Sequence, residues 1–196
     1  MAVDLPNLLS SAKALIFDCD GTLANTPPVY AQAWAAGVRA AGHDMPTDWY
    51  LARAGLSEGA LMDAFEQWAG VVLPREDVIR VMRDAFIENV SLLEEIAIIT
   101  AIAREHQGKL PQAVASGGSR QIVRLTLDEL GLTPLFDTIV TFDDVGRPKP
   151  APDLFLEAAR RLGAPPQDCL VFEDSEQGFE AARRAGMTVV DVTAML

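Results

Sequence analysis

Hydrophobic and polar positions follow two different patterns along the chain. Short apolar runs, typical of buried strands, occupy residues 14–17, 113–115, 139–142, 169–172 and 188–192. From residue 113 onward, segments with helical spacing of apolar residues lie between these runs. Because strands that alternate with helices form parallel sheets with right-handed crossovers, we predict an α/β fold built on a parallel sheet.

Residues 29–92 depart from this alternation, since their apolar positions have helical spacing and hardly any strand-like run occurs. The predicted inner faces of three helices hold Trp34 and Val38; Leu61, Phe65 and Trp68; and Val78, Val81, Met82, Ala85 and Phe86. A turn-forming run at residues 25–28 marks the boundary before them. We therefore predict a helical domain at residues 25–92, inserted into a core made of residues 1–24 and 93–196.

Polar residues follow several of the apolar runs. They are Asp18 and Asp20 after the first run, Ser116 after the second, and Glu173 and Asp174 after the run at 169–172. The carboxyl ends of parallel strands lie at one edge of a sheet, so these residues should converge there. Lys149 follows the run at 139–142, in a loop that Pro148, Pro150 and Pro152 stiffen. The sequence predicts one polar site at this edge.

The pair Asp18 and Asp20 suggests a metal ion. Two close carboxylates repel each other unless one is protonated or a divalent cation with oxygen ligands joins them, and Mg²⁺ is the usual candidate. An isolated Asp-x-Asp-Gly sequence is equally compatible with a surface turn, whereas an EF-hand calcium loop requires a Glu at its twelfth position that is absent here. Four carboxylates, a hydroxyl and an ammonium together suit a metal-assisted phosphoryl transfer, in which a carboxylate can be the nucleophile.

Composition narrows the range of partners. The 196 residues are 49% apolar and 22% charged, which is typical of a globular protein. Acidic residues outnumber basic ones 28 to 16, and the net charge of −12 argues against binding to nucleic acid. No apolar segment approaches the roughly 20 residues that span a membrane, and residues 1–13 lack a signal-peptide pattern. We expect a cytoplasmic protein with Cys19 and Cys169 as free, buried thiols.

Four motifs in order along the chain resemble those of the haloacid dehalogenase superfamily. They are Phe17-Asp18-Cys19-Asp20-Gly21-Thr22, Val114-Ala115-Ser116-Gly117, Lys149-Pro150-Ala151-Pro152-Asp153 and Phe172-Glu173-Asp174-Ser175. The chain is similar to the branch with a helical cap after the first strand, which includes β-phosphoglucomutase and small sugar phosphatases. The resemblance implies a Rossmann-like core with an α-helical cap. It also implies an Mg²⁺-dependent phosphatase that acts on a small phosphorylated metabolite, with a sugar phosphate as the expected substrate.

The resemblance also implies a role for each residue of the polar site. Asp18 corresponds to the nucleophile and a metal ligand, Asp20 to the general acid/base that ligates through its backbone carbonyl, Ser116 and Lys149 to the groups that hold the phosphoryl, Asp174 to a metal ligand, and Glu173 to a ligand or an orienter of bound water. Such a division suits phosphoryl transfer, which needs positioning and charge neutralisation above all. We expect no other cofactor, and a monomer or weak homodimer.

Other activities of the superfamily fit less well. Dehalogenases have no counterpart of Asp20, and related phosphonate hydrolases use a cap lysine, whereas residues 25–92 contain no Lys. β-Phosphoglucomutase carries an Arg after a Gly-x-Ser triplet that grips a second phosphate, and Glu58 stands at that place here. A carboxylate would repel that phosphate, so a phosphatase fits better than a mutase. We expect Tyr30, Arg53 and Glu58 to contribute to selectivity.

Three alternatives to a phosphatase remain open. The first is a phosphosugar mutase, and the second is a non-catalytic relative that binds phosphate, although the intact pair Asp18 and Asp20 argues against it. The third is a phosphoacceptor like a response regulator, whose compact fold has no place for a helical insert of this length. Hydrolysis of a phosphate ester with Mg²⁺ would distinguish an enzyme from the non-catalytic relative, and transient rather than stable phosphorylation of Asp18 would distinguish it from the phosphoacceptor.

Overall fold

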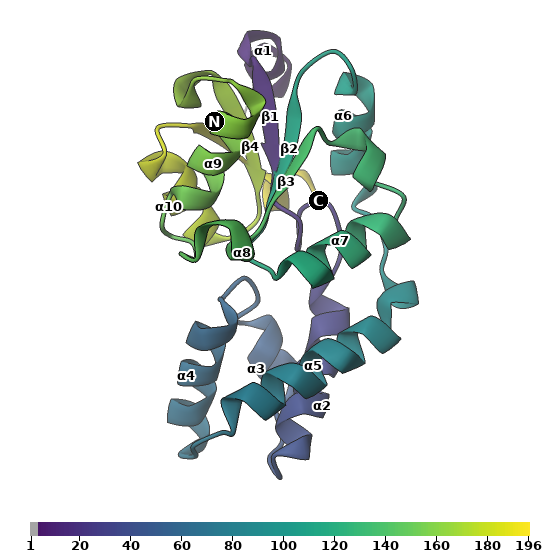
Figure 1. The fold of residues 1–196 in the computed structure, drawn as a ribbon, viewed down its shortest axis with the longest axis vertical. Helices are drawn as coiled ribbons and strands as arrows, with labels where there is room; N and C mark the ends of the chain where they lie inside the picture. Colours follow the sequence, from purple (N-terminus) through teal and green to yellow (C-terminus); the bar gives the residue numbers. More distant parts are fainter. Residues whose placement is uncertain (1–3) are drawn as a thin grey trace.

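A parallel sheet of five strands forms the centre of one half of the molecule. The computed structural model describes residues 4–196, and the strand order is β3-β2-β1-β4-β5. The strands are β1 (Ala14–Phe17), β2 (Gln112–Ala115), β3 (Thr138–Val140), β4 (Cys169–Glu173) and β5 (Thr188–Asp191). Neighbouring strands all pair in parallel. The structure thus confirms the predicted α/β fold, with β1 in the middle of the sheet (Figure 1).

Helices cover both faces of this sheet. One face carries α1 (Leu5–Ser11), α6 (Ala97–His106) and α7 (Arg120–Glu129), and the other carries α9 (Asp153–Leu162) and α10 (Glu176–Arg184). Along β1, Ile16 packs with the α9 side and Phe17 with the α6 side, and both are fully buried. Because both faces of the strand are buried, its sequence is a continuous apolar run rather than an alternating one.

The third strand is shorter than its apolar run suggested. Instead of continuing to Phe142, it ends at Val140, and a short helix, α8 (Phe142–Val145), begins at once. Thr141 caps this helix, since Asp144 accepts hydrogen bonds from the Thr141 backbone and hydroxyl at 2.9 Å each. Helix α1 was not predicted. Short 3-10 turns lie at Thr133–Leu135, Pro166–Asp168 and Val192–Met195.

The segment that follows β1 is entirely helical. It contains α2 (Pro27–Ala40), α3 (Thr47–Leu51), α4 (Glu58–Ala69), α5 (Arg75–Glu88) and a 3-10 turn at Val90–Leu92. Figure 1 shows these helices as a separate group beyond one end of the sheet. Helices α2 and α5 lie in close contact, because a Cβ atom on Gly37 would lie 2.5 Å from the carbonyl oxygen of Val78. The division of the chain into a core and a cap at residues 25 and 92 stays a prediction.

The interior of this helical segment largely matches the predicted faces. Trp34, Leu61 and Phe65 are buried in one apolar cluster with Met82 and Phe86. Trp68 was expected inside and is instead 54% exposed. It lies at the edge of the cluster, with its ring centroid 5.5 Å from that of Trp49. A large ring at the end of an amphipathic face can cover the core without entering it.

Two further sequence expectations concern the thiols and the membrane. Cys19 and Cys169 are free and buried, as predicted. No helix within residues 4–196 has the length and apolar character that crossing a membrane would require.

Candidate active site

The site residues meet where the strands end. Asp18 follows β1 directly, and its backbone N–H donates to the carbonyl oxygen of Phe172 at 3.0 Å, which extends the pairing of β1 with β4. Ser116 likewise follows β2, with its N–H 3.0 Å from the carbonyl oxygen of Val140, and Glu173 is the last residue of β4. The carboxyl ends of the strands face the helical segment (Figure 1). Parallel strands therefore place these side chains at one edge, as predicted.

Lys149 joins two of the strand ends. Its Nζ lies 2.5 Å from Oδ1 of Asp18 and 2.6 Å from Oε2 of Glu173. Burial alone would lower the pKa of Lys149, but the two carboxylates outweigh it and raise the pKa above its usual value. The ammonium also lies 5.0 Å from the ring centroid of Phe155 on α9. The proline-rich loop thus delivers a permanent positive charge to the buried Asp18.

Three carboxylates gather beside this ammonium. Oxygen atoms of Asp18, Glu173 and Asp174 lie within 4.8 Å of one another. Burial and the charge of Glu173 raise the pKa of Asp18 well above its usual value, and they raise that of Asp174 to about 7. The mutual repulsion of these carboxylates destabilises the ionised cluster when no cation is present. Their oxygen atoms match the ligands that Mg²⁺ prefers. The residues therefore fit a bound divalent cation.

A glycine makes room for this cluster. Gly21 has a φ angle of +81°, and a Cβ atom there would lie 2.2 Å from Oδ2 of Asp174. The hydroxyl of Thr22 donates to the other oxygen of Asp174 at 3.3 Å. The Gly-Thr pair after Asp20 thus turns the chain and holds Asp174 close to β1, which only glycine permits at position 21.

Glu173 is held from several sides. Its Oε1 accepts from the backbone N–H groups of Asp174 at 3.2 Å and Ser175 at 3.1 Å, and from the Ser175 hydroxyl at 2.8 Å. A Cβ atom on Gly178 would lie 1.9 Å from the Glu173 carboxyl carbon, so the side chain lies directly against the first turn of α10. Its other oxygen receives Lys149. Glu173 therefore fixes the position of Lys149, besides either role that the sequence predicted for it.

Asp20 and Ser116 form a second pair. The Ser116 hydroxyl lies 3.3 Å from Oδ2 of Asp20 and also accepts from the Gly118 N–H at 3.0 Å. Within the described residues, Oδ1 of Asp20 is buried without a hydrogen-bond partner. Burial raises the pKa of Asp20, which favours a protonated carboxyl group. The arrangement suits a group that gives and takes a proton.

A cavity opens above these residues, between the strand ends and the helical segment. Its far wall comes from the helical segment and includes Tyr30, Trp34, Tyr50, Leu56, Ser57 and Glu58. Tyr30 and Glu58 were expected at the site. Arg53 does not line the cavity, because its guanidinium lies 4.1 Å from the ring centroid of Trp49 and donates to the Trp49 carbonyl at 2.9 Å.

Sequence reasoning missed Trp34 and Tyr50 as cavity residues. Trp34 is only 3% exposed and belongs to the apolar cluster, so its helical spacing correctly predicted burial but did not show that it also borders a cavity. Its position four residues after Tyr30, on the same face of α2, is the signal that was available.

Comparison with known proteins agrees with this geometry. The haloacid dehalogenase-like hydrolase family matches residues 12–186. The fructose-1-phosphate phosphatase YqaB of Escherichia coli is 34% identical over 182 residues, which cover 91% of this chain and 95% of that protein.

Two solved structures are also similar. A hydrolase from Pseudomonas syringae superposes with a TM-score of 0.81 at 27% identity, over 91% of this chain and 84% of that one. CbbY from Rhodobacter sphaeroides, in complex with xylulose-(1,5)bisphosphate, superposes with a TM-score of 0.79 at 25% identity, over 91% and 84% of the two chains.

Proposed function

The chain belongs to the haloacid dehalogenase-like hydrolases and is a phosphoric monoester hydrolase, and on this basis we propose that it hydrolyses a small sugar phosphate through an aspartyl-phosphate on Asp18. The observation that carries this proposal is the contact of Lys149 with both Asp18 and Glu173 on the floor of the cavity. A carboxylate beside a buried ammonium, open to a cavity, is suited to attack a phosphoryl group.

In the first step, an oxygen of Asp18 attacks phosphorus and the bond from phosphorus to the leaving oxygen breaks. Asp20 donates its proton to that oxygen, so the product alcohol leaves neutral. The raised pKa of Asp20 supports this role, because the carboxyl group stays protonated more readily before transfer. The turn at Gly117 and Gly118 lines the cavity and can bind the phosphoryl oxygens there, while the Ser116 hydroxyl lies beneath it, 3.3 Å from Asp20.

In the second step, water attacks the aspartyl-phosphate and Asp20 takes its proton. The bond between phosphorus and Asp18 breaks, which releases inorganic phosphate and restores the carboxylate. Lys149 stays beside Asp18 throughout and stabilises its negative charge. Both steps rely on positioned groups rather than on unusual reactivity of the protein.

We propose Asp18, Glu173 and Asp174, with the backbone carbonyl of Asp20, as the residues that would hold Mg²⁺. When bound, Mg²⁺ would supply positive charge that neutralises these carboxylates and the oxygens of the phosphoryl group. We also propose that residues 25–92 act as a cap, whose residues Tyr30, Trp34 and Glu58 surround the leaving group and exclude water.

The test is hydrolysis of p-nitrophenyl phosphate and a panel of sugar phosphates, with Mg²⁺ or with a chelator. We expect turnover with Mg²⁺ and its loss with the chelator, in Asp18→Asn and in Asp20→Asn. Acid-quenched protein incubated with a ³²P-labelled ester should carry label that Asp18→Asn lacks. Equal rates for wild type and Asp18→Asn would refute the proposal.

A further inference from the structure

The cap side of the cavity carries one carboxylate, and its surroundings define what it can bind. Glu58 begins α4 and lines the cavity that also contains Asp18 and Asp20. Arg83 of α5 holds this carboxylate from behind, with its Nε and Nη2 atoms 3.1 and 3.0 Å from Oε1, and Nη2 2.9 Å from Oε2. Arg83 does not itself line the cavity. This two-armed contact fixes the orientation of Glu58.

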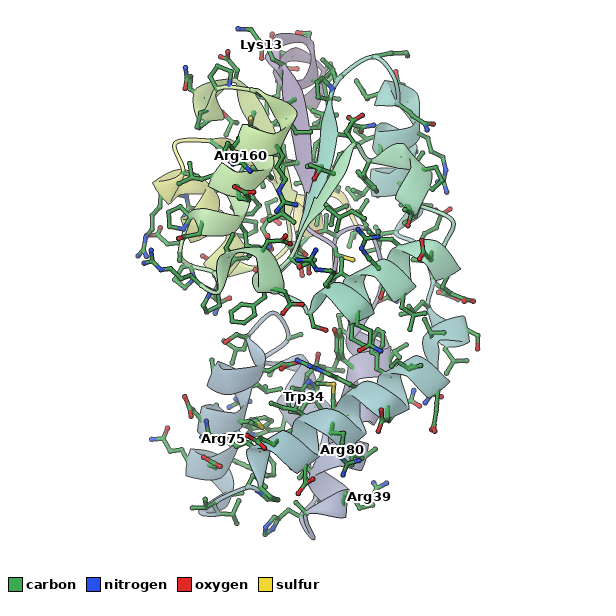
Figure 2. The ribbon with its side chains drawn as sticks, viewed as in Figure 1. Lys13, Trp34, Arg39, Arg75, Arg80 and Arg160 are labelled. Atoms are coloured by element: carbon green, nitrogen blue, oxygen red, sulfur yellow. The ribbon has the colours of Figure 1, made fainter. Side chains whose placement is uncertain are left out.

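Most of the charged side chains that line the cavity are acidic. In the part of the chain that the structure describes, Lys149 is the only cationic side chain lining the cavity, and Asp18 and Glu173 already occupy it. Arg53 is held against Trp49 and does not line the cavity, and Figure 2 shows Arg39, Arg75 and Arg80 toward the end of the helical segment that is remote from the sheet. A second phosphate on the leaving group would therefore meet Glu58 without a cation to receive it.

Hydroxyl groups of the leaving alcohol, unlike a second phosphate, can bind to Glu58. A carboxylate oxygen bound on one side by a guanidinium keeps lone pairs free to accept from an O–H group. Because Arg83 balances the charge of Glu58, the pair favours hydrogen-bond donors over cations. The rings of Tyr30, Trp34 and Tyr50 line the same wall and offer apolar faces to the C–H groups of a sugar.

We propose that Glu58, held by Arg83, accepts hydrogen bonds from hydroxyl groups of the leaving alcohol, so that the enzyme selects uncharged polyol monophosphates and rejects bisphosphates. This inference rests on the proposed function, since it concerns the leaving group of the same reaction. It separates the chain from its similar structure CbbY, which binds xylulose-(1,5)bisphosphate. Glu58 is the selectivity residue and Arg83 its positioning residue.

The first experiment compares kcat/KM for a hexose monophosphate, a ketose 1,5-bisphosphate and p-nitrophenyl phosphate in wild type, Glu58→Gln and Glu58→Ala. Wild type should prefer the monophosphate to the bisphosphate. Glu58→Ala should lose about 10- to 100-fold on the monophosphate, the range for one hydrogen bond to a charged group, with a smaller loss for Glu58→Gln. The loss on p-nitrophenyl phosphate, which has no sugar hydroxyls, should be clearly smaller than the loss on the hexose monophosphate, so that the ratio of the two kcat/KM values changes.

Asp63→Asn is the matched control. Asp63 lies on the same helix and also pairs with an arginine, Arg75, at 2.6 Å, but does not line the cavity. Its kcat/KM should be unchanged on all three substrates. Equal losses on the sugar and the aryl ester in Glu58→Ala, or unchanged hexose phosphate turnover, would overturn the inference while leaving the phosphatase proposal intact. Efficient wild-type turnover of the bisphosphate would overturn it too.

Arg83→Gln tests the positioning role separately. Without the guanidinium, Glu58 keeps its negative charge unbalanced, so phosphoethanolamine, whose leaving group is cationic, should gain in kcat/KM relative to the hexose monophosphate. A merely structural defect would lower all substrates together. Such a uniform loss would show that Arg83 supports the fold and not the selectivity of Glu58.

Discussion

At the scale of single residues, Lys149 is a buried cation that contacts two carboxylates of the site. Its side chain is 9% exposed, and its ammonium lies between two carboxylates whose side chains are even more buried. Removal of one partner from a buried ion pair leaves the other charges uncompensated, which is far more costly than the loss of a surface pair. The same ammonium therefore supports both the fold of the metal-free protein and the ionised state of Asp18.

We predict that Lys149→Met lowers the free energy of unfolding by about 3 to 5 kcal/mol when measured with a chelator. Mg²⁺ should recover part of this loss, because binding of a cation to the folded state alone stabilises it. Activity should fall at every Mg²⁺ concentration. The measurement is urea denaturation with and without Mg²⁺, beside steady-state kinetics.

Lys13→Met is the control for this prediction. Lys13 pairs with Asp168 at 2.6 Å but is 69% exposed, and such pairs contribute about 1 kcal/mol or less. Similar losses in both variants would contradict the role assigned to burial, and so would an Lys149→Met protein that unfolds at the wild-type denaturant concentration.

At the scale of elements, Asp144 ties α8 to two longer helices. Its carboxylate receives Arg120 of α7 at 3.0 Å and Arg161 of α9 at 2.7 Å, besides capping its own helix at Thr141. Burial opposes ionisation, but the hydrogen bonds from Arg161 and Thr141 outweigh it and lower the pKa of Asp144 to about 2. Stabilisation by Asp144 is thus present above its unfolded pKa of 3.8 and is lost as the pH falls toward 2.

We predict that Asp144→Asn lowers the free energy of unfolding at pH 7 by about 2 to 3 kcal/mol, which corresponds to the fall of the pKa from 3.8 to about 2. The difference from wild type should shrink between about pH 4 and pH 2, where the native carboxylate takes up its proton. Urea denaturation across this pH range measures it. Asp84→Asn, which removes an exposed partner 3.8 Å from Arg80, should change little at any pH. A difference independent of pH would contradict the assignment to ionisation.

The limits of sequence reasoning also appear at this scale. The apolar runs predicted all five strands because strands buried on both faces, such as β1, need apolar residues throughout. The predicted end of β3 was wrong because Phe142 is apolar enough for a strand, whereas the capping box of Thr141 and Asp144 starts a helix there. Helix α1 has only 7 residues, too few for a periodic pattern to stand out.

The site was predicted to the extent that strand ends determine it. Parallel topology alone brought Asp18, Ser116 and Glu173 to one edge. The pairing of Glu58 with Arg83 could not be predicted in this way, since it joins residues 25 positions apart on two helices whose relative placement depends on packing. Arg53 was expected at the site and stacks on Trp49 instead, because an aromatic face nearby competes for a guanidinium.

At the scale of the whole molecule, the loop between α3 and α4 packs against the part of the chain that follows β4. Gly55, in this loop, has a φ angle of +92°, and a Cβ atom there would lie 3.1 Å from the Cβ of Ser175. Ser175 in turn donates to Glu173 and caps α10. The loop that presents Glu58 to the cavity therefore lies against Ser175, which holds the Glu173 carboxylate that contacts Lys149. Packing of this loop against Ser175 is thus linked to the positions of Glu58 and Glu173.

We predict that Gly55→Ala lowers kcat/KM for a sugar phosphate by about tenfold or more, which corresponds to a barrier higher by about 1.4 kcal/mol. The added methyl group would push the loop away from Ser175 and move Glu58 from its place at the cavity. Gly42→Ala is the matched control, since Gly42 has a similar φ angle of +82° but no atom within 4 Å of an added Cβ. Both variants should lose about 1 to 2 kcal/mol of stability from backbone strain, and only Gly55→Ala should lose activity. Thermal unfolding measures the loss of stability, and steady-state kinetics measures kcat/KM. If both variants lose the same activity, backbone strain alone explains the loss, and the contact of this loop with Ser175 does not affect the site.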